Sequence, residues 1–243
     1  MSVLRFENVT YRIDGREILK DLSFDLAPGR ALVLLGRSGS GKTTALKMVN
    51  ALLLPSSGRV LVEGRPTTDW NPIELRRRIG YVIQETGLFP HFTIARNVGL
   101  VPRLNGWPED KIDARVDELL ARVGLPPAEY AHRYPRQLSG GQRQRVGVAR
   151  ALAADPPILL FDEPFGALDP VTRHEIRREF TALARDLQKT ILFVTHSVRE
   201  ALELGDQIGV LAGGRLEELL PAAEFPSALS AEARAFHACL RDD

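Results

Sequence analysis

The first 35 residues alternate between short apolar segments and turn residues. Segments 4–9 and 18–26 show partial alternation of apolar and polar positions, and Asp14-Gly15 lies between them as a typical hairpin turn. We therefore predict strands at 4–9, 11–13 and 18–26 that form an antiparallel sheet. The run 31–35 is apolar throughout, which indicates a strand that is buried on both faces.

The central part of the chain has a helical pattern. Between about residues 93 and 155 the strand signals disappear, and apolar residues recur at helical spacing with charged residues between them. These apolar residues are Ile112, Val116, Leu119, Leu120 and Val123. We therefore predict a helical subdomain over about 93–155 that is inserted into the rest of the fold.

Outside this insert, strand-like runs and helical patterns alternate. The strand-like runs are 59–62, 81–83, 157–161, 190–194 and 207–211. The helical patterns are 42–54, 73–78, 170–187, 197–204 and 230–240. This alternation predicts an α/β core with a mainly parallel sheet and right-handed crossovers. We assign 1–220 to one domain and 221–243 to a short C-terminal tail.

The composition excludes several classes of protein. Of the 243 residues, 44% are hydrophobic and 26% are charged, which argues against a disordered chain and against a membrane bundle. The net charge of +1 provides no general basic field for nucleic acid. No targeting signal is visible and the apolar runs are strand-sized, so we do not expect the chain to span a membrane. The single cysteine, Cys239, cannot form an internal disulfide, which fits a reducing compartment.

A glycine-rich motif follows the buried strand at 31–35. Its residues are Gly36, Arg37, Ser38, Gly39, Ser40, Gly41, Lys42 and Thr43, with Thr44 next in the chain. They match the phosphate-loop pattern Gly-x4-Gly-Lys-Ser/Thr between a strand and a helix, which predicts a P-loop NTPase core that binds a nucleoside triphosphate. Lys42 would reach the β and γ phosphates, and the Thr43 hydroxyl would ligate Mg²⁺. The alternative is a glycine-rich turn that precedes a helix by chance.

An acidic pair follows the apolar run at 158–161. Asp162 is the candidate Mg²⁺ partner, and Glu163 is the candidate base that takes a proton from an attacking water. Two adjacent carboxylates in different environments can divide these roles. Without the phosphate loop, the same pair would be interpreted as a solvated turn.

A third motif lies between the two nucleotide motifs, just before an apolar helix. Its residues are Leu138, Ser139, Gly140, Gly141 and Gln142, and they resemble the signature of ATP-binding cassette (ABC) ATPases. Further family motifs occur in order: Tyr11 as the adenine-stacking aromatic, Gln84 in the sensor loop, Ala167-Leu168-Asp169 as the D-loop, and His196 in the switch loop. The resemblance covers almost the whole chain.

The resemblance to ABC ATPases implies roles for these residues. It implies that 1–220 is a nucleotide-binding domain, and that Gln84 ligates Mg²⁺ and acts in catalysis beside Glu163 and His196. In this family two cassettes pair head to tail, and each signature closes over the γ-phosphate of the other. Ser139, Gly141 and Gln142 would then act in trans, in a homodimer or with a paired ATPase subunit.

Three of these residues also have simpler interpretations. A serine before two glycines is a common helix N-cap. Without the family motifs, His196 would be a polar residue at a strand end, and Tyr11 would be a strand aromatic that packs on the N-terminal sheet.

The segment 84–92 places aromatic residues beside glycine and proline. In transporter ATPases this region resembles the surface that receives a coupling helix of the membrane subunit. The alternative interpretation is hydrophobic packing beneath the loop. Stretches 79–91 and 97–102, with Gly106-Trp107, resemble importers of quaternary-amine osmoprotectants such as glycine betaine or choline.

The osmoprotectant resemblance implies several partners. They are integral membrane permease subunits and an extracytoplasmic substrate-binding protein, with this chain at the cytoplasmic face of the cell membrane. An importer of another small solute, such as an amino acid or a polyamine, is the first alternative. A non-transport ABC ATPase usually has long coiled-coil inserts or tandem cassettes, and a purely regulatory nucleotide-binding module is expected to lack a base such as Glu163.

Overall fold

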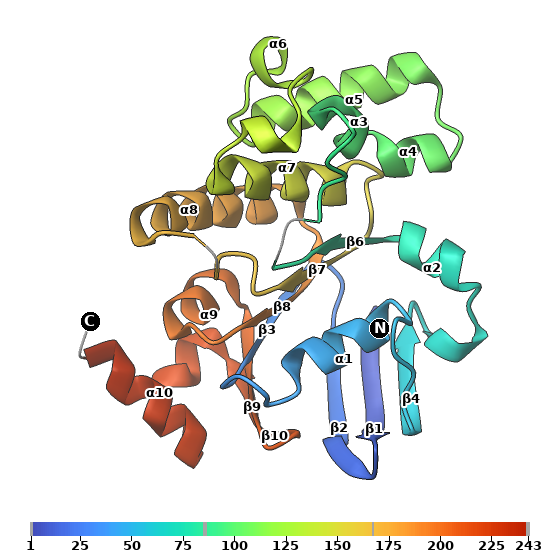
Figure 1. Cartoon of the computed structure of the whole chain (residues 1–243). Coiled ribbons are helices and arrows are strands. Elements are labelled where there is room, and N and C mark those ends of the chain that lie inside the picture. The colour runs from blue at the N-terminus through green and yellow to red at the C-terminus, as the bar shows by residue number, and fades with distance from the viewer. Residues whose placement is uncertain (1, 85–86, 167, 242–243) are drawn as a thin grey trace. The chain divides into compact units, whose positions relative to one another are not determined.

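The computed structural model describes residues 2–84, 87–166 and 168–241. The chain divides into two compact units, Met1–Arg76 with Gln188–Asp243, and Arg77–Leu187 (Figure 1). Glu85 and Thr86 of the osmoprotectant-like stretch and Ala167 of the D-loop lie outside the described residues, as does the side chain of Cys239.

An antiparallel sheet begins the first unit. Strand β1 (Leu4–Ile13) pairs with β2 (Arg16–Leu26) on one side and with β4 (Ser57–Val62) on the other, and β4 pairs with β5 (Arg65–Pro66). Phe6 lies opposite Phe24, and their rings stack with centroids 4.4 Å apart. The predicted strands 4–9 and 11–13 are one continuous strand, because irregularities in the β1–β2 register replace a break.

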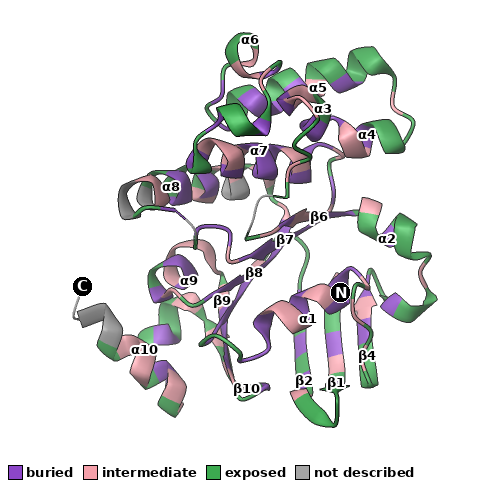
Figure 2. Cartoon of the chain, in the orientation of Figure 1, coloured by how far each residue is buried: buried purple, intermediate pink, exposed green. Residues whose placement is uncertain are grey.

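A second set of strands in this unit positions the phosphate loop. Strand β3 (Ala31–Leu35) lies between β8 (Thr190–Thr195) and β9 (Gln207–Ala212) and is parallel to both. Strand β10 (Arg215–Pro221) adds to β9 in antiparallel orientation. Figure 2 shows β3 and β8 almost wholly buried, as continuous apolar runs predict.

Helices surround these strands within the first unit. Helix α1 contacts β8 and β4, α9 contacts β3 and β8, and α10 contacts α9 and β9. The bounds are α1 (Lys42–Val49), η1 (Thr67–Asp69), α2 (Pro72–Arg77), α9 (Val198–Leu204), η3 (Ala222–Ser227) and α10 (Ala231–Arg241). Several loops and helices of this unit follow strand ends, which is where sites form in α/β proteins.

Sequence reasoning was wrong about two further features of this unit. The helix expected at 42–54 ends at Val49, because Ala51 adopts a positive φ of 50° and Arg76 donates to the backbone oxygens of Asn50 and Ala51. Strand β10 was not predicted. It alternates between exposed and half-buried residues, and only its pairing with β9 makes it a strand.

The second unit contains two parallel strands and a series of helices. Strand β6 (Ile79–Val82) pairs with β7 (Ile158–Asp162), with Ile79 opposite Ile158 and Val82 opposite Phe161. The helices between them are α3 (Ile94–Val98), α4 (Leu100–Leu104), α5 (Glu109–Arg122), α6 (Pro127–Tyr130), η2 (Pro135–Gln137) and α7 (Gly140–Leu152). Helix α8 (Pro170–Leu187) follows β7.

The buried face of α5 is the predicted one. Ile112, Val116, Leu119 and Leu120 are all buried. Helix α8 brings Phe180 to within 4.4 Å of the Phe161 ring, measured between centroids. In the parts of the chain that the structure describes, none of the helices is long and apolar enough to cross a bilayer. The predicted α/β class, with an N-terminal antiparallel sheet and mainly parallel strands elsewhere, is confirmed.

Candidate functional site

The phosphate loop connects β3 to α1, and its glycines are required by the backbone. Gly39 and Gly41 have positive φ values of 81° and 103°, a conformation that residues with a Cβ rarely adopt. A Cβ on Gly41 would also lie 2.6 Å from the Leu19 side chain, and one on Gly36 would lie 2.3 Å from the Leu211 oxygen. The predicted loop therefore forms a tight turn that leads directly into the N-terminus of α1.

Polar groups inside the loop are arranged to bind an anion. Lys42 is 4% exposed, and its Nζ donates to the backbone oxygens of Gly36 at 2.7 Å and Arg37 at 3.0 Å. Ser40 Oγ is buried, and it has no hydrogen-bond partner among the described residues. An unsatisfied buried hydroxyl typically costs about 1–3 kcal/mol, and a phosphate oxygen would satisfy it. These residues fit a triphosphate.

The second residue of the loop interacts with the C-terminal helix. Arg37 Nε lies 2.8 Å from Glu232 Oε1 in α10, 195 residues later in the chain. The Arg37 side chain is largely exposed, so this ion pair contributes about 0–1 kcal/mol to stability. No local pattern in the sequence indicated this contact, and Glu232 was not among the predicted site residues. Ser38 and Gly39 at the tip of the loop are exposed.

His196 lies at the same strand edge as the phosphate loop. It directly follows β8, whose last residue, Thr195, is opposite Leu35 and accepts a hydrogen bond from Gly36 N at 3.4 Å. The His196 side chain is exposed. The turn beneath it is held by buried Thr195, which donates through Oγ1 to the carboxylate of buried Glu200.

Sequence reasoning did not identify the Thr195–Glu200 pair. Glu200 is 5% exposed although it lies in a short helix with polar neighbours. The cap of α9 provides a partial signal, because Ser197 Oγ accepts from the Glu200 backbone N at 3.4 Å. Together these contacts fix the chain on either side of His196.

Tyr11 lies on β1, next to strand β2, and β2 contains a residue that lies against the phosphate loop. It is opposite Leu19 of β2, and Leu19 is the residue whose side chain lies against Gly41. Thr43 and Thr44 are half-buried in the first turn of α1. The first unit therefore brings together the predicted adenine, phosphate and switch residues.

The acidic pair lies at the carboxyl end of β7 in the second unit. Asp162 is the last residue of the strand and is 8% exposed. Glu163 has a positive φ of 44°, and its backbone oxygen accepts from Gly166 N at 3.1 Å, which closes the turn. Positive φ at a residue with a long side chain costs of order 1–3 kcal/mol and is concentrated at functional sites.

Gln84 lies beside this turn. Parallel pairing of β6 with β7 places the ends of both strands at one edge. A Cβ added to Gly166 would be 3.4 Å from Gln84 Nε2, so the exposed Gln84 side chain reaches the turn that follows Glu163. The second unit therefore places Gln84 beside the turn that follows the acidic pair.

Tyr81 also reaches the acidic pair. Its hydroxyl donates to Asp162 Oδ2 at 3.1 Å. Burial, followed by the Asp162 charge and this hydrogen bond, raises the pKa of Tyr81 above its ordinary value. Sequence reasoning placed Tyr81 in a predicted strand and in a subfamily stretch but gave it no role in the site.

The signature residues form the N-terminus of α7. Ser139 caps the helix, with Oγ accepting from Gln142 N at 3.2 Å while Gln142 Oε1 accepts from Ser139 N at 2.9 Å. A Cβ on Gly141 would lie 2.6 Å from Thr172 Cγ2, so close packing against α8 requires a glycine. Leu138 is buried, whereas Ser139 and Gly140 are exposed.

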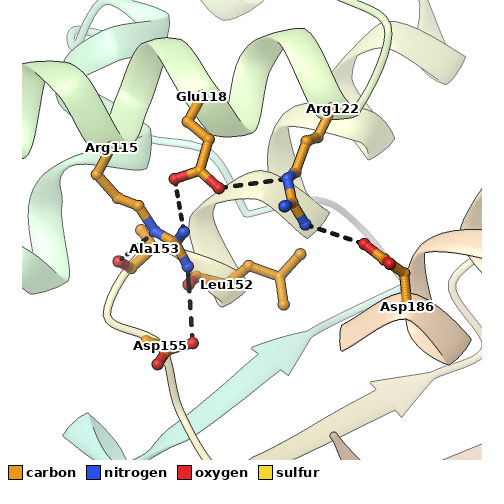
Figure 3. Close-up of polar contacts among 7 residues, drawn as sticks. All are labelled: Arg115, Glu118, Arg122, Leu152, Ala153, Asp155 and Asp186. Atoms are coloured by element: carbon orange, nitrogen blue, oxygen red, sulfur yellow. Dashed lines mark hydrogen bonds and ion pairs between the residues drawn. The ribbon is translucent and has the colours of Figure 1, made fainter. Parts of the chain in front are cut away.

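The other end of α7 is held by an ion-pair network (Figure 3). Arg115 of α5 donates to the backbone oxygens of Leu152 and Ala153, which belong to the last turn of α7 and its C-cap. Glu118 accepts from Arg115 and lies 3.2 Å from Arg122, which in turn donates to Asp186 of α8. The signature helix is therefore tied to α5 at its C-terminus.

Asp169 of the D-loop caps α8. Its Oδ1 accepts from Thr172 N at 3.0 Å, and its side chain is exposed. Arg173 donates to the backbone oxygens of Phe165 and Leu168, which fixes the loop before the helix.

The aromatic segment forms a cluster around a buried amide. The Phe89 and Phe92 rings have centroids 5.1 Å apart, and His91 packs edge-on against Phe92 at 4.5 Å. Asn97 is fully buried, donates through Nδ2 to the oxygens of Phe89, Phe92 and Thr93, and accepts from Phe89 N at 2.8 Å. Phe89 nevertheless remains 41% exposed.

Replacing Asn97 by alanine is expected to lower the free energy of unfolding by about 2–4 kcal/mol, because buried backbone groups of the 89–93 segment would lose their partners. Chemical denaturation measures the change, with Asn105→Ala in an exposed position as the control. Equal stabilities of the two variants would show that Asn97 does not organise the segment.

The osmoprotectant-like stretches lie partly in this region. Residues 97–102 run from α3 into α4, and Gly106 turns the chain after α4 with a φ of 74°. The Lys111 ammonium lies 4.1 Å from the centre of the Trp107 ring. These residues build the start of the helical segment.

Phosphate loop, acidic pair and capped signature helix together define a cassette-type nucleotide-binding protein. Residues 19–166 match the family described as ABC transporter, and the chain belongs to this family. It is 51% identical over 219 residues to the glycine betaine/carnitine/choline transport ATP-binding protein OpuCA of Bacillus subtilis (strain 168), covering 87% of this chain and 57% of that protein. It is 49% identical over 219 residues to the choline transport ATP-binding protein OpuBA of the same organism, covering 89% and 57%.

A solved structure resembles most of this chain. The dimeric, post-hydrolysis ATP-binding cassette MJ0796 bound to ADP and Pi matches with a TM-score of 0.79 and 34% sequence identity, covering 90% of this chain and 98% of that one. The chain spans 57% of the length of the two Bacillus relatives.

Proposed function

We propose that this chain hydrolyses ATP to drive a membrane importer of quaternary amines such as glycine betaine or choline. The main support is sequence similarity: about half of the aligned residues are identical to those of relatives named for transport of these solutes. The phosphate loop supports ATP binding, because Lys42 is buried in it and the buried Ser40 hydroxyl has no hydrogen-bond partner among the described residues.

ATP is held mainly by the first unit in this proposal. Backbone N–H groups of the loop and the start of α1 bind the phosphates, and Lys42 reaches the β and γ phosphates. Tyr11 stacks on the adenine. The phosphate-binding residues are Gly36, Arg37, Ser38, Gly39, Ser40, Gly41, Lys42, Thr43 and Thr44.

Thr43, Gln84 and Asp162 are the proposed Mg²⁺ ligands. A hydroxyl, an amide oxygen and a carboxylate are the hard oxygen donors that Mg²⁺ prefers. The position of Asp162 at a strand end, with Gln84 beside the following turn, supports this assignment. When bound, Mg²⁺ neutralises charge on the phosphate oxygens.

Glu163 is the proposed general base, with Gln84 and His196 completing the catalytic set. Glu163 takes a proton from the water that attacks the γ-phosphate. His196 senses the γ-phosphate from the turn after β8. The position of Glu163 directly after Asp162, at the carboxyl end of β7, supports this assignment.

A second cassette completes the site in this proposal, either a second copy of this chain or a paired ATPase subunit. Ser139, Gly141 and Gln142 act in trans on the γ-phosphate, and Asp169 lies in the D-loop of the same closing surface. The N-terminal dipole of α7 favours a negative ligand at the signature. The similarity to a dimeric cassette supports the pairing.

Permease subunits are the proposed membrane partners, and an extracytoplasmic binding protein delivers the solute. The exposed Phe89 and the neighbouring ring of Phe92 offer apolar surface for a coupling helix. In this proposal, the chain lies at the cytoplasmic face of the cell membrane.

In a strain without other osmoprotectant importers, deleting the gene is expected to abolish the uptake of labelled glycine betaine or choline at high salt. Reintroducing the wild-type gene restores uptake, whereas the Glu163→Gln gene does not, because transport requires hydrolysis. The measurement is radiolabel accumulation in a strain without other osmoprotectant importers. Unchanged uptake of both amines with loss of amino-acid or polyamine uptake would overturn the substrate class.

A further inference from the structure

Tyr81 lies on β6, and the register of the β6–β7 pair directs its side chain toward the end of β7 that carries Asp162, the proposed Mg²⁺ ligand. It is opposite Leu160 in the parallel β6–β7 pair. Side chains alternate between the faces of a strand, so Leu160 and Asp162 share the face on which Tyr81 lies. The hydroxyl of Tyr81 accordingly ends 3.1 Å from Asp162 Oδ2.

The hydroxyl is not needed to pack the strand. The neighbours of Tyr81 in β6 include buried Ile79 and Val82, and the half-buried ring could be supplied equally well by phenylalanine. A partly buried hydroxyl must instead be matched with a hydrogen-bond partner. Asp162 is that partner, because its Oδ2 accepts the hydrogen bond from the Tyr81 hydroxyl.

We propose that Tyr81 is a positioning residue that fixes the orientation in which Asp162 receives Mg²⁺. The inference rests on the metal role proposed for Asp162. The carboxylate torsion of aspartate is intrinsically broad, whereas a tyrosine ring has few rotatable bonds, so the hydrogen bond transfers the rigidity of the ring to the carboxylate. Partners that orient metal ligands in this way typically change metal affinity by about 10- to 100-fold.

Mn²⁺ binding tests the proposal without relying on turnover. Tyr81→Phe is compared with the parent protein, both in a Glu163→Gln background. The protein is in excess over ATP, so that the ATP is bound, and free Mn²⁺ is measured by electron paramagnetic resonance. We expect Mn²⁺ affinity to fall about 10-fold. ATP affinity in EDTA is expected to stay within about twofold, because the phosphate loop does not depend on Tyr81. The exposed Tyr134→Phe is the matched control.

A second readout separates positioning from simple packing. In the otherwise native chain, Tyr81→Phe is expected to raise the Mg²⁺ concentration for half-maximal hydrolysis about 10-fold, while turnover at saturating Mg²⁺ stays close to that of the parent. Loss of ATP affinity in EDTA, or lower turnover at every Mg²⁺ concentration with unchanged metal dependence, would overturn the positioning role.

Asp162→Asn distinguishes this inference from the proposed function. If Asp162→Asn weakens Mn²⁺ binding and Tyr81→Phe leaves it within about twofold, the role of Tyr81 is wrong and the metal site stands. If neither substitution changes Mn²⁺ binding, the metal assignment of Asp162 and the inference drawn from it are both overturned.

Discussion

Glu163→Gln is expected to lower ATP turnover by about 10²- to 10⁴-fold, the usual contribution of a general base, while ATP affinity is preserved. The amide cannot accept a proton from water, but it has nearly the same size as the carboxylate. The phosphate loop lies at other positions in the chain and is unchanged. Phosphate release under saturating ATP and equilibrium binding of a fluorescent ATP analogue measure the two properties.

Lys42→Ala, in contrast, should weaken ATP binding itself, because Lys42 lies inside the phosphate loop. Glu175→Gln, on the exposed face of α8, is the matched control for changing a glutamate to its amide and should leave both properties unchanged. Turnover of Glu163→Gln at the parent rate would remove Glu163 from the role of base.

Ser139→Arg is expected to abolish ATP-driven dimerisation. The Glu163→Gln protein should be mainly monomeric without nucleotide and dimeric with ATP, because uncleaved ATP keeps both shared sites closed. An arginine at position 139 adds bulk and places a positive charge at the positive end of α7. An unpaired charge buried in an interface costs about 3–5 kcal/mol, which corresponds to a loss of dimer affinity of about 10²- to 4 × 10³-fold.

Light scattering over a range of protein concentrations, with and without ATP, measures this effect. Ser139→Ala is the control for added bulk and charge. It loses the hydroxyl, which caps the helix at about 1 kcal/mol and is also proposed to contact the γ-phosphate in trans, so it should dimerise more weakly but still dimerise at higher concentration. A Glu163→Gln protein that remains the same monomer at high concentration with ATP would contradict the shared site.

Much of the fold could be predicted because its signals are local. The apolar runs that became β3, β7 and β8 are buried on both faces, and the helical pattern at 170–187 matches the bounds of α8. The errors occurred where distant residues decide the outcome. Helix α1 is stopped by a turn that Arg76 stabilises, and β10 is a strand only because β9 offers an edge.

The sequence alone determined the chemistry of the candidate site. The order of glycines in the phosphate loop dictates a backbone that only glycine adopts easily, and the acidic pair follows directly from the end of an apolar strand. Both are properties of consecutive residues. They could therefore be identified before any tertiary contact was known.

Tertiary structure decided which residues support that chemistry. Tyr81 donates a hydrogen bond to Asp162, which lies 81 residues later in the chain, and Arg37 donates to Glu232, which lies 195 residues later. Such pairs depend on strand register and on helix packing, which are set by the burial of many side chains at once and leave no mark at either position alone. The sequence specified the candidate reacting groups, and the packing of distant strands and helices determined which residues contact them.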